Sequence, residues 1–557
     1  MSLQPQPIGP IPEETARVAR AAFPKGNVYM QMRDALGTVY DDASFAALFA
    51  TRGRPAEAPW RLALVTVRQF AEGLSDRQAA EAVRGRSDWK YALGLELTDP
   101  GFDFSVLSEF RQRLVAGAAE HLVLDRLLTA CRARGLLRAR GRQRTDSTHV
   151  LGALRVVNRL EAVAETLRSA LNAIAAVAPE WLRAWVPAEW FERYDRRVED
   201  ARLPKGQAAR QTYAETVGGD GWRLLTALWE PTAPPALREL PAADLLRRTW
   251  IQHYVILDGR IRLRDPKDMP PAAQQIESPY ESEARFSTKR GLHWVGYKVH
   301  LTESCDDDLP HLVTQVKTTI APEPDGEQLA AIQAGLARSA LLPGQHLVDA
   351  GYVRGQNLVA SRAQHQIDLV GPIADDHQWQ AQAGEGFDLA HFRVDWEARV
   401  VHCPRGRPSG RWCATQTARD RTMIHIDCAP ADCTPCPDRA RCTRAKTQPR
   451  SLTLQVRAEH EAIQAARARP ATPEFAAAYA PRAGVEGSLS QGVRVCGLRR
   501  ARYRGLRKTH LQHVATAAAV NISRLHNWLA GASRAKTRCS RFAALDPTKT
   551  TRPASAG

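Results

Sequence analysis

Long apolar segments are missing from this sequence of 557 residues. The run at residues 170–178, among the longest, stops at Pro179, whereas a membrane-spanning helix needs roughly 18 apolar residues. The first residues lack the basic and then apolar pattern of a secretory signal peptide. Glycine and proline, at 36 and 35 residues, are too few for a low-complexity or collagen-like chain. We therefore expect a folded cytoplasmic protein without a membrane partner.

Acidic residues are the minority charge: 60 Asp and Glu stand against 77 Lys and Arg, which leaves a net charge of +17. Such an excess draws a protein toward a polyanion, and nucleic acid is the leading partner that this composition predicts. The length allows three to four domains at about 150 residues each, which is enough for a substantial enzyme.

Residues 1 to about 135 are predicted to be helical. Ser75 and Gln78 form the S-x-x-Q pattern of a capping box, and Ser105 is predicted to cap a further helix. Short helices joined by tight turns are compatible with a helix-turn-helix domain and equally with a plain helical bundle.

From Gly141 onward the pattern predicts a sheet interrupted by insertions. Strands are predicted at residues 143–151, 293–301, 312–320, 346–350 and 367–371, and helices at 327–341, 357–364, 483–489 and 511–528. A Trp-rich helical insertion occupies about residues 155–280, and a second insertion, rich in Pro, Arg and Cys, spans residues 374–473. Three strands followed by alternating helices and strands predict a mixed α/β sheet covered by helices. We expect residues 533–557 to be a disordered basic tail.

Three acidic residues stand where the predicted sheet would hold a reactive site. Asp146 lies inside the first strand, Asp349 ends a later strand, and Glu486 lies near the start of a helix. Carboxylates in such positions are costly unless they pair with a cation. Hard oxygen ligands suit Mg²⁺, and two such ions can serve an in-line displacement at a phosphodiester. Each acid alone fits a turn or a solvated helix; the three together predict a metal-dependent site.

Six of the ten cysteines crowd between Cys403 and Cys442, which indicates metal chemistry in a reducing compartment. The candidate ligands of a tetrahedral structural Zn²⁺ are Cys403, Cys433, Cys436 and Cys442. Cys413 and Cys428 are alternative ligands. A reduced cluster without metal is the competing interpretation.

Four motifs connect these features to a known family: Arg144-Thr-Asp-Ser-Thr-His149, Gly296-Tyr-Lys-Val-His300, Leu347-Val-Asp-Ala-Gly-Tyr352 and Tyr479-Ala-Pro-Arg-Ala-Gly-Val-Glu486. They closely resemble the bacterial insertion-sequence transposases of the DDE class, whose Y-x₂-R-x₃-E-x₆-K signature matches Tyr479, Arg482 and Glu486. The lysine of that signature falls at Val493, with Arg494 beside it, so either Arg494 takes over its contact with the DNA backbone or that contact is lost. The likeness covers nearly the whole chain.

The resemblance implies a ribonuclease-H-like catalytic core with a helical N-terminal domain, a helical insertion and a Cys-rich insertion. The resemblance covers about residues 37–114 for the N-terminal domain and 142–529 for the core and insertion. With the sequence pattern, we expect residues 1–135 to bind DNA, 136–373 and 474–532 to form the two parts of the core, and 374–473 to form the Cys-rich insertion. Asp146, Asp349 and Glu486 would hold Mg²⁺ or Mn²⁺. The implied enzyme hydrolyses a phosphodiester at the terminal inverted repeats of an insertion sequence and transfers the freed 3′-hydroxyl to target DNA.

Double-stranded DNA is the expected partner, both as element end and as target, with a homo-oligomer assembled on it in the bacterial cytoplasm at the nucleoid. The basic run at residues 494–508 adjoins the proposed active site, and Tyr503 and Leu506 interleave it, which favours DNA-backbone binding over a solvated face. The residues expected to contact DNA are Tyr479, Arg482, Arg494, Arg499, Arg500, Arg502, Arg504 and Lys298.

Two other functions remain open. One is a catalytically silent DNA-binding regulator derived from such an enzyme, and the other is a ribonuclease-H-like nuclease without strand transfer. The retention of Asp146, Asp349 and Glu486 favours the active transposase, because a silent descendant has no use for buried acids.

Overall fold

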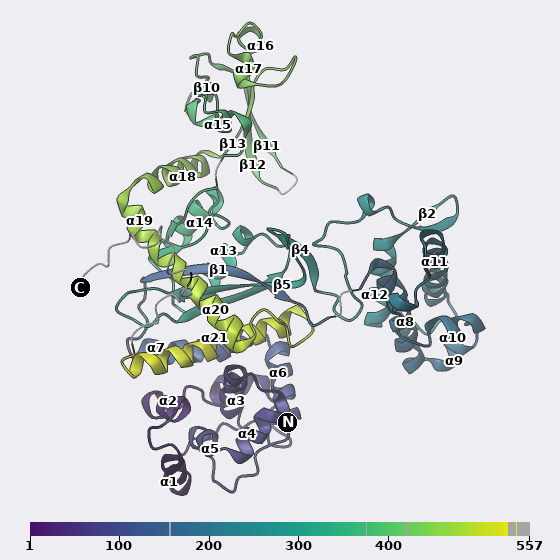
Figure 1. Cartoon of the computed structure of the whole chain (residues 1–557), viewed down its shortest axis with the longest axis vertical. Helices are drawn as coiled ribbons and strands as arrows, with labels where there is room; N and C mark the ends of the chain where they lie inside the picture. Colours follow the sequence, from purple (N-terminus) through teal and green to yellow (C-terminus); the bar gives the residue numbers. More distant parts are fainter. Residues whose placement is uncertain (155–156, 375, 418–419, 533–541, 543–557) are drawn as a thin grey trace.

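The computed structural model describes residues 1–154, 157–374, 376–417, 420–532 and 542. Figure 1 shows a central sheet with the N-terminal helices packed below it, a helical arm to one side and a small module extending from the opposite end. Apart from position 542, the predicted tail at 533–557 lies outside the described residues. Within the described part of the chain, no helix combines the length and the apolar character that crossing a bilayer demands.

The central sheet has the ribonuclease-H-like strand order, which confirms the predicted fold class. Its strands are β1 (Arg142–Leu151), β4 (Arg285–Lys289), β5 (Leu292–Ser304), β6 (Val313–Ile320), β7 (Gln345–Leu347) and β8 (Asp368–Val370). β5 lies between β6 and β1 and is antiparallel to both, whereas β7 and β8 extend the sheet parallel to β1. β4 forms a hairpin with the start of β5.

Gly296 permits the close approach of β5 to β1. Its φ is +155°, and a Cβ at this position would lie only 2.2 Å from the carbonyl oxygen of Val150. Only glycine fits a backbone contact this tight. The close pairing of β5 with β1 therefore explains why the Gly296-to-His300 motif begins with glycine.

The N-terminal helices share one hydrophobic core with the sheet. They are α1 (Glu13–Ala22), α2 (Val28–Leu36), α3 (Pro59–Glu72), α4 (Asp76–Gly85), α5 (Ser87–Leu93), α6 (Ser105–Ala116) and α7 (Leu122–Ala133). The capping box of Ser75 and Gln78 is confirmed at the start of α4. Ser105 is instead the first residue of α6, where its N–H donates to the Asp103 carboxylate.

The long C-terminal helix α21 (Leu506–Leu529) joins the N-terminal helices to the sheet (Figure 1). It packs on β6 along one side and on α3, α2, α6 and α7 along the other. Leu511, Val514 and Leu525 are buried within this shared core. Residues 1–135 are thus a helical layer of the same packed body, since α21 completes their core.

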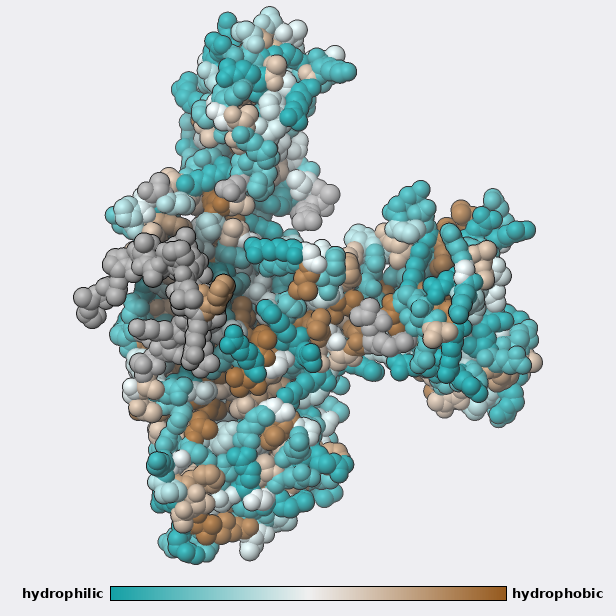
Figure 2. All heavy atoms as spheres, in the orientation of Figure 1, coloured by the Kyte–Doolittle hydropathy of each residue, from teal (hydrophilic) through white to brown (hydrophobic). Residues whose placement is uncertain are grey.

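The helical insertion has a core of its own. It contains α8 (Arg159–Val177), α9 (Pro179–Arg183), α10 (Ala188–Tyr194), α11 (Gln207–Trp229) and α12 (Pro241–His253), followed by an unpredicted hairpin of β2 (Tyr254–Leu257) and β3 (Arg260–Leu263). Trp185 and Trp190 meet edge to face inside it. Figure 2 shows hydrophobic residues at the surface of this arm. Ile256 of the hairpin and Trp229 of α11 are about half exposed and line one cavity.

The Cys-rich insertion forms a small module around short strands. It comprises α15 (Trp379–Ala383), β9 (Arg393–Asp395), β10 (Val400–His402), β11 (Ser409–Gln416), β12 (Thr422–Cys428), α16 (Pro430–Cys433), α17 (Arg439–Cys442) and β13 (Ser451–Gln455). β12 is the central strand between β11 and β13.

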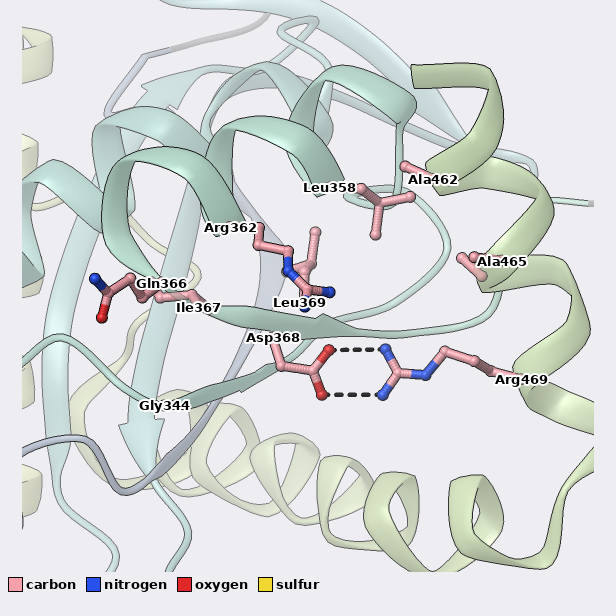
Figure 3. A pocket seen from close by; sticks show the side chains of 11 residues that line it. Gly344, Leu358, Arg362, Gln366, Ile367, Asp368, Leu369, Ala462, Ala465 and Arg469 are labelled. Carbon is pink, nitrogen blue, oxygen red and sulfur yellow. Dashed lines mark hydrogen bonds and ion pairs between the residues drawn. The ribbon is translucent and has the colours of Figure 1, made fainter. Parts of the chain in front are cut away.

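The chain returns to the core from this module through α18 (Arg457–Ala468) and α19 (Pro473–Tyr479). α18 packs on α14 (Gly355–His365). In the sequence, α14 is preceded by α13 (Leu329–Arg338), which follows β6. Both guanidinium Nη atoms of Arg469 pair with the Asp368 carboxylate at 2.8 and 2.9 Å, beside a cavity of about 810 Å³ (Figure 3). This two-point ion pair ties the returning segment to β8, the edge strand of the sheet.

Candidate active site

The pairing of β1 with β7 brings Asp146 and Asp349 to the same edge of the sheet. The parallel register aligns Arg144 with Leu347, and each acid lies two residues beyond that pair. Glu486 comes from the first turn of α20 (Gly484–Cys496), which packs against β1 and β5. The predicted acids therefore come from two adjacent strands and the helix that covers them.

Arg482 lies among the three carboxylates. Its Nη2 is 2.9 Å from Asp146 Oδ2 and 3.8 Å from Asp349 Oδ2, and its Nη1 is 3.3 Å from Glu486 Oε1. The Arg482 side chain is 12% exposed, and that of Glu486 is 69% exposed. One largely buried guanidinium thus occupies the space in which the three acids meet.

Burial makes this space favourable for a cation. Desolvation raises the pKa of Asp146, while the Arg482 guanidinium and the N–H of Ser147 act in the opposite direction. Asp349 is held in place because its Oδ1 accepts the N–H of Gly351 at 2.9 Å. Because water solvates the Asp146 carboxylate poorly, positive charge beside it is favoured.

A fourth acid, Asp325, lies next to this cluster and was missed by the sequence analysis. It opens the short helix η5 (Asp325–Glu327), and its carboxylate accepts from Lys298 Nζ at 2.8 Å and from Ser147 Oγ at 2.9 Å. A Cβ placed on Gly351 would lie 3.0 Å from Asp349 Oδ1 and 3.8 Å from Asp325 Oδ2. Burial acts to raise the pKa of Asp325, but the Lys298 ammonium outweighs it and holds that pKa below its ordinary value.

Lys298 was expected to contact DNA, and the structure gives it a different environment. Its ammonium donates to the Glu323 carbonyl at 2.7 Å as well as to Asp325, and the residue is 9% exposed. A phosphate would have to displace a buried carboxylate to reach it. In this structure Lys298 is the partner of Asp325, and its contact with DNA stays a prediction.

His300 and Tyr352 support the loop that follows Asp349. His300 Nδ1 lies 2.6 Å from the Tyr352 hydroxyl, and both side chains are buried. Burial lowers the pKa of His300 to about 4, so the imidazole is neutral at physiological pH. This contact connects β5 to the loop and explains why both residues belong to the motifs.

Behind the acids, Glu303 ties the elements of the site together. The Glu303 carboxylate is fully buried and accepts from Arg144 Nη2 and from Arg524 Nη1, each at 2.6 Å, and from the Ser488 hydroxyl. Arg144 also donates to the carbonyl of Pro481. The network joins β1, β5, α20 and α21, and it fixes the turn that carries Arg482.

The predicted DNA-contacting residues have varied surroundings. Tyr479 stacks on Phe475, with ring centroids 5.5 Å apart, which supports packing as its role. Arg502 donates to the Leu74 carbonyl at 3.0 Å, so it also links the basic run to the N-terminal helices. Arg494 is exposed in the last turn of α20. The lysine position of the family signature falls at the residue before it, Val493.

Five thiols surround one small cavity in the Cys-rich module. The cavity has a volume of about 40 Å³, and the thiols that line it are those of Cys403, Cys428, Cys433, Cys436 and Cys442. Cys413 does not line it. Burial, followed by the nearby Cys433, raises the pKa of Cys428 to about 12.

In the described ranges, no group of three or more His, Cys, Asp or Glu side chains is arranged to hold a metal ion. The thiols converge on the cavity without closing such a site, and in the acid cluster Arg482 stands between the carboxylates. Both clusters nevertheless present donors of the expected kind: soft sulfur in one and hard oxygen in the other.

Comparison with known proteins adds two matches. Residues 402–526 match a family described as "Transposase DDE domain", and residues 17–113 match one described as "Transposase domain (DUF772)". The first match contains Arg482 and Glu486, whereas Asp146 and Asp349 lie outside it. No curated protein matches the chain.

Proposed function

We propose that this chain is an insertion-sequence DDE transposase that cuts DNA at the ends of its element and joins the freed 3′ ends to a target. Its matches to two transposase families support the proposal. The observation that carries the proposal is the convergence of Asp146, Asp349 and Glu486 around one guanidinium. The ribonuclease-H-like sheet supports it, because the strand order brings the first two acids together.

The acid cluster fits Mg²⁺ or Mn²⁺ in the chemistry of its donors. Asp146, Asp349 and Glu486 would hold the ions through carboxylate oxygens, the ligands that hard divalent cations prefer. Bound there, such ions would supply Lewis-acid chemistry: they would lower the pKa of a water and stabilise charge on the leaving oxygen of a phosphodiester. Asp325, already neutralised by Lys298, is not needed as a ligand and holds the Ser147 side of the site in position.

Arg482 has two successive roles in this proposal. Without DNA, its guanidinium lies among the three acids and offsets part of their negative charge. With DNA, its planar group is suited to grip a phosphate in two-point fashion beside Glu486, which would release the carboxylates. Arg499, Arg500 and Arg504 extend the positive surface away from the site, and the N-terminal helices contribute recognition of the element end.

Joining two element ends to one target requires two active sites, so we propose that the enzyme works as a homo-oligomer on double-stranded DNA. The direct test uses purified full-length protein and duplexes carrying the short inverted repeats that flank the gene. Cleavage and joined products with Mg²⁺ or Mn²⁺ support the proposal. Cleavage without joining would identify a nuclease, and binding without cleavage a regulator; either result overturns it.

Arg482→Ala is expected to strengthen Mn²⁺ binding to the DNA-free protein by about tenfold. The variant removes the cation that competes for the three carboxylates, and hydrogen bonds to charged groups contribute about 1.5–3 kcal/mol, where about 1.4 kcal/mol is tenfold. Isothermal titration with MnCl₂ measures the affinity. Arg494→Ala, an exposed arginine on the neighbouring helix α20, is the control and should leave it unchanged. Equal or weaker Mn²⁺ binding by Arg482→Ala would contradict the competition.

We also propose that the thiols of the Cys-rich module bind one structural Zn²⁺. Their convergence on one cavity supports this, and zinc would draw them closer and lower their pKa values. Protein prepared without chelator should contain about one zinc per chain. The double change Cys433→Ser and Cys436→Ser should release it, whereas Cys413→Ser should not, because Cys413 does not line the cavity. Zinc-free protein with freely titratable thiols would leave a reduced cysteine cluster as the answer.

A further inference from the structure

A cavity of about 420 Å³ lies where the helical insertion meets the end of β1. We call it the junction pocket. It is lined by Leu151 at the end of β1, by Arg197 and Tyr280 of the insertion region, and by Arg500 and Arg504 of the basic run. Three parts of the chain that are distant in sequence thus form one concave surface.

The pocket is rich in unpaired positive charge. Arg197, Arg500 and Arg504 are exposed, and within the described ranges none of their guanidinium groups forms an ion pair or a hydrogen bond. The neighbouring acids are otherwise engaged: Glu281 and Glu283 accept the backbone N–H groups of the first residues of α21 and its cap. Three guanidinium groups that have no carboxylate partner in the described part of the chain surround one cavity, which favours an anionic ligand.

Tyr280 forms a rigid aromatic centre between these charges. The Cζ atoms of Arg197 and Arg504 each lie 5.5 Å from its ring centroid. Its hydroxyl accepts from Arg168 at 3.0 Å and donates to Glu165, so the ring is fixed from the α8 side. A fixed ring that orients two guanidinium groups lowers the entropic cost of binding a phosphate.

The basic run leads from the catalytic acids to this pocket. Arg499 Nε donates to Thr148 Oγ1 at 2.8 Å, and Thr148 is two residues beyond Asp146, on the same face of β1. The N–H of Leu151 then bonds to the Arg499 carbonyl at 2.8 Å. Since a strand rises about 3.3 Å per residue, the end of β1 is about 17 Å from Asp146.

From this geometry we infer that the junction pocket binds the phosphate backbone of the element-end duplex, and that the helical insertion, through Arg197 and Tyr280, is therefore part of the DNA-binding surface. The inference rests on the proposed function. A separation of about 17 Å corresponds to about five base pairs at 3.4 Å per base pair along one strand. The contacted phosphates are thus expected four to six base pairs from the cleaved one.

The test measures binding of a fluorescent element-end duplex by anisotropy across a range of salt concentrations. The double variant Arg197→Ala and Arg504→Ala is expected to bind about tenfold more weakly and to reduce the salt slope by about 1 to 2, the effect of losing one or two phosphate contacts. Arg183→Ala, an exposed arginine of α9 paired with Glu180, is the matched control and should behave as wild type.

Neutral methylphosphonates placed singly along the duplex identify the contacted phosphates. For wild-type protein, substitution four to six base pairs from the cleavage site should weaken binding, and the double variant should show no further loss there. If wild-type protein cleaves the duplex while the double variant keeps the wild-type affinity and slope, the pocket inference is wrong and the proposed function stands. If wild-type protein neither binds nor cleaves the duplex, both fail. The inference would also be overturned if binding of a free mononucleotide depended on Arg197 but binding of the duplex did not.

Discussion

Protein carrying Asp349→Ala is expected to bind an element-end duplex with wild-type affinity and to cleave it at least about a thousandfold more slowly. Asp349 supplies one of the three carboxylates of the cluster. It lies beyond the end of β7, where its side chain accepts the N–H of Gly351, so the substitution should leave the sheet intact. Removing one group that stabilises developing charge in an active site costs about 10²–10³ in rate, and loss of a metal ligand adds to this. Asp146→Ala and Glu486→Ala should behave alike.

Binding and cleavage are measured on the same duplex by anisotropy and by gel analysis with Mg²⁺. Asp368→Ala is the matched control, because Asp368 is an acid on the neighbouring strand β8 whose partner is Arg469 rather than Arg482. It should cleave at close to the wild-type rate. An Asp349→Ala variant that retains full activity would remove this residue from the mechanism.

Glu303→Ala is expected to lower the free energy of unfolding of the core by about 3–5 kcal/mol, the cost of leaving a buried charge without its partner. The substitution leaves the guanidinium groups of Arg144 and Arg524 facing a cavity in place of a carboxylate. Urea denaturation followed by tryptophan fluorescence measures the loss. Glu180→Ala is the control: its pair with Arg183 is largely solvent-exposed and should contribute less than about 1 kcal/mol. A loss at Glu303 no larger than this would mean that the network does not hold the core.

The same network predicts how stability depends on pH. Burial acts to raise the pKa of Glu303, but Arg524 and Arg144 outweigh it, so the folded-state pKa lies below the ordinary value. A carboxyl of this kind stabilises the fold at pH values above its unfolded pKa, about 4.3, and the contribution is lost as the pH falls through the folded-state value. Wild-type protein should therefore lose stability below about pH 4, and Glu303→Ala should show a smaller loss there.

Most of the sheet could be predicted from the sequence, because its longer strands β1, β5 and β6 are rich in β-branched residues. The five-residue strand β4 was missed. β1 and β6 are predicted to within one residue at each end. The β2–β3 hairpin was missed although Asp258 and Gly259, with φ of +50° and +70°, are a typical two-residue turn pair. Its flanking strands are only four residues long, and they follow a helix without a break.

In the candidate site, too, residues in local sequence motifs could be predicted, whereas contacts between distant parts of the chain could not. Asp146, Asp349 and Glu486 could be predicted because each falls in a motif at a recognisable place in its own element. Asp325 could not, because its importance comes from Lys298, which reaches it from strand β5. The position of Arg482 among the acids likewise depends on how α20 and the preceding turn fold back onto β1.

The packing of α21 affects when the protein can fold during its synthesis. The ribosome makes the helices between Glu13 and Ala133 first, yet the helix that covers their apolar faces follows every strand of the sheet. Until Leu506–Leu529 has been synthesised, these early helices and β6 keep exposed hydrophobic surface. Contacts between the two ends of a chain form slowly, and unfinished intermediates of this kind are aggregation-prone. The packed core can therefore be completed only after nearly all of the chain has been translated.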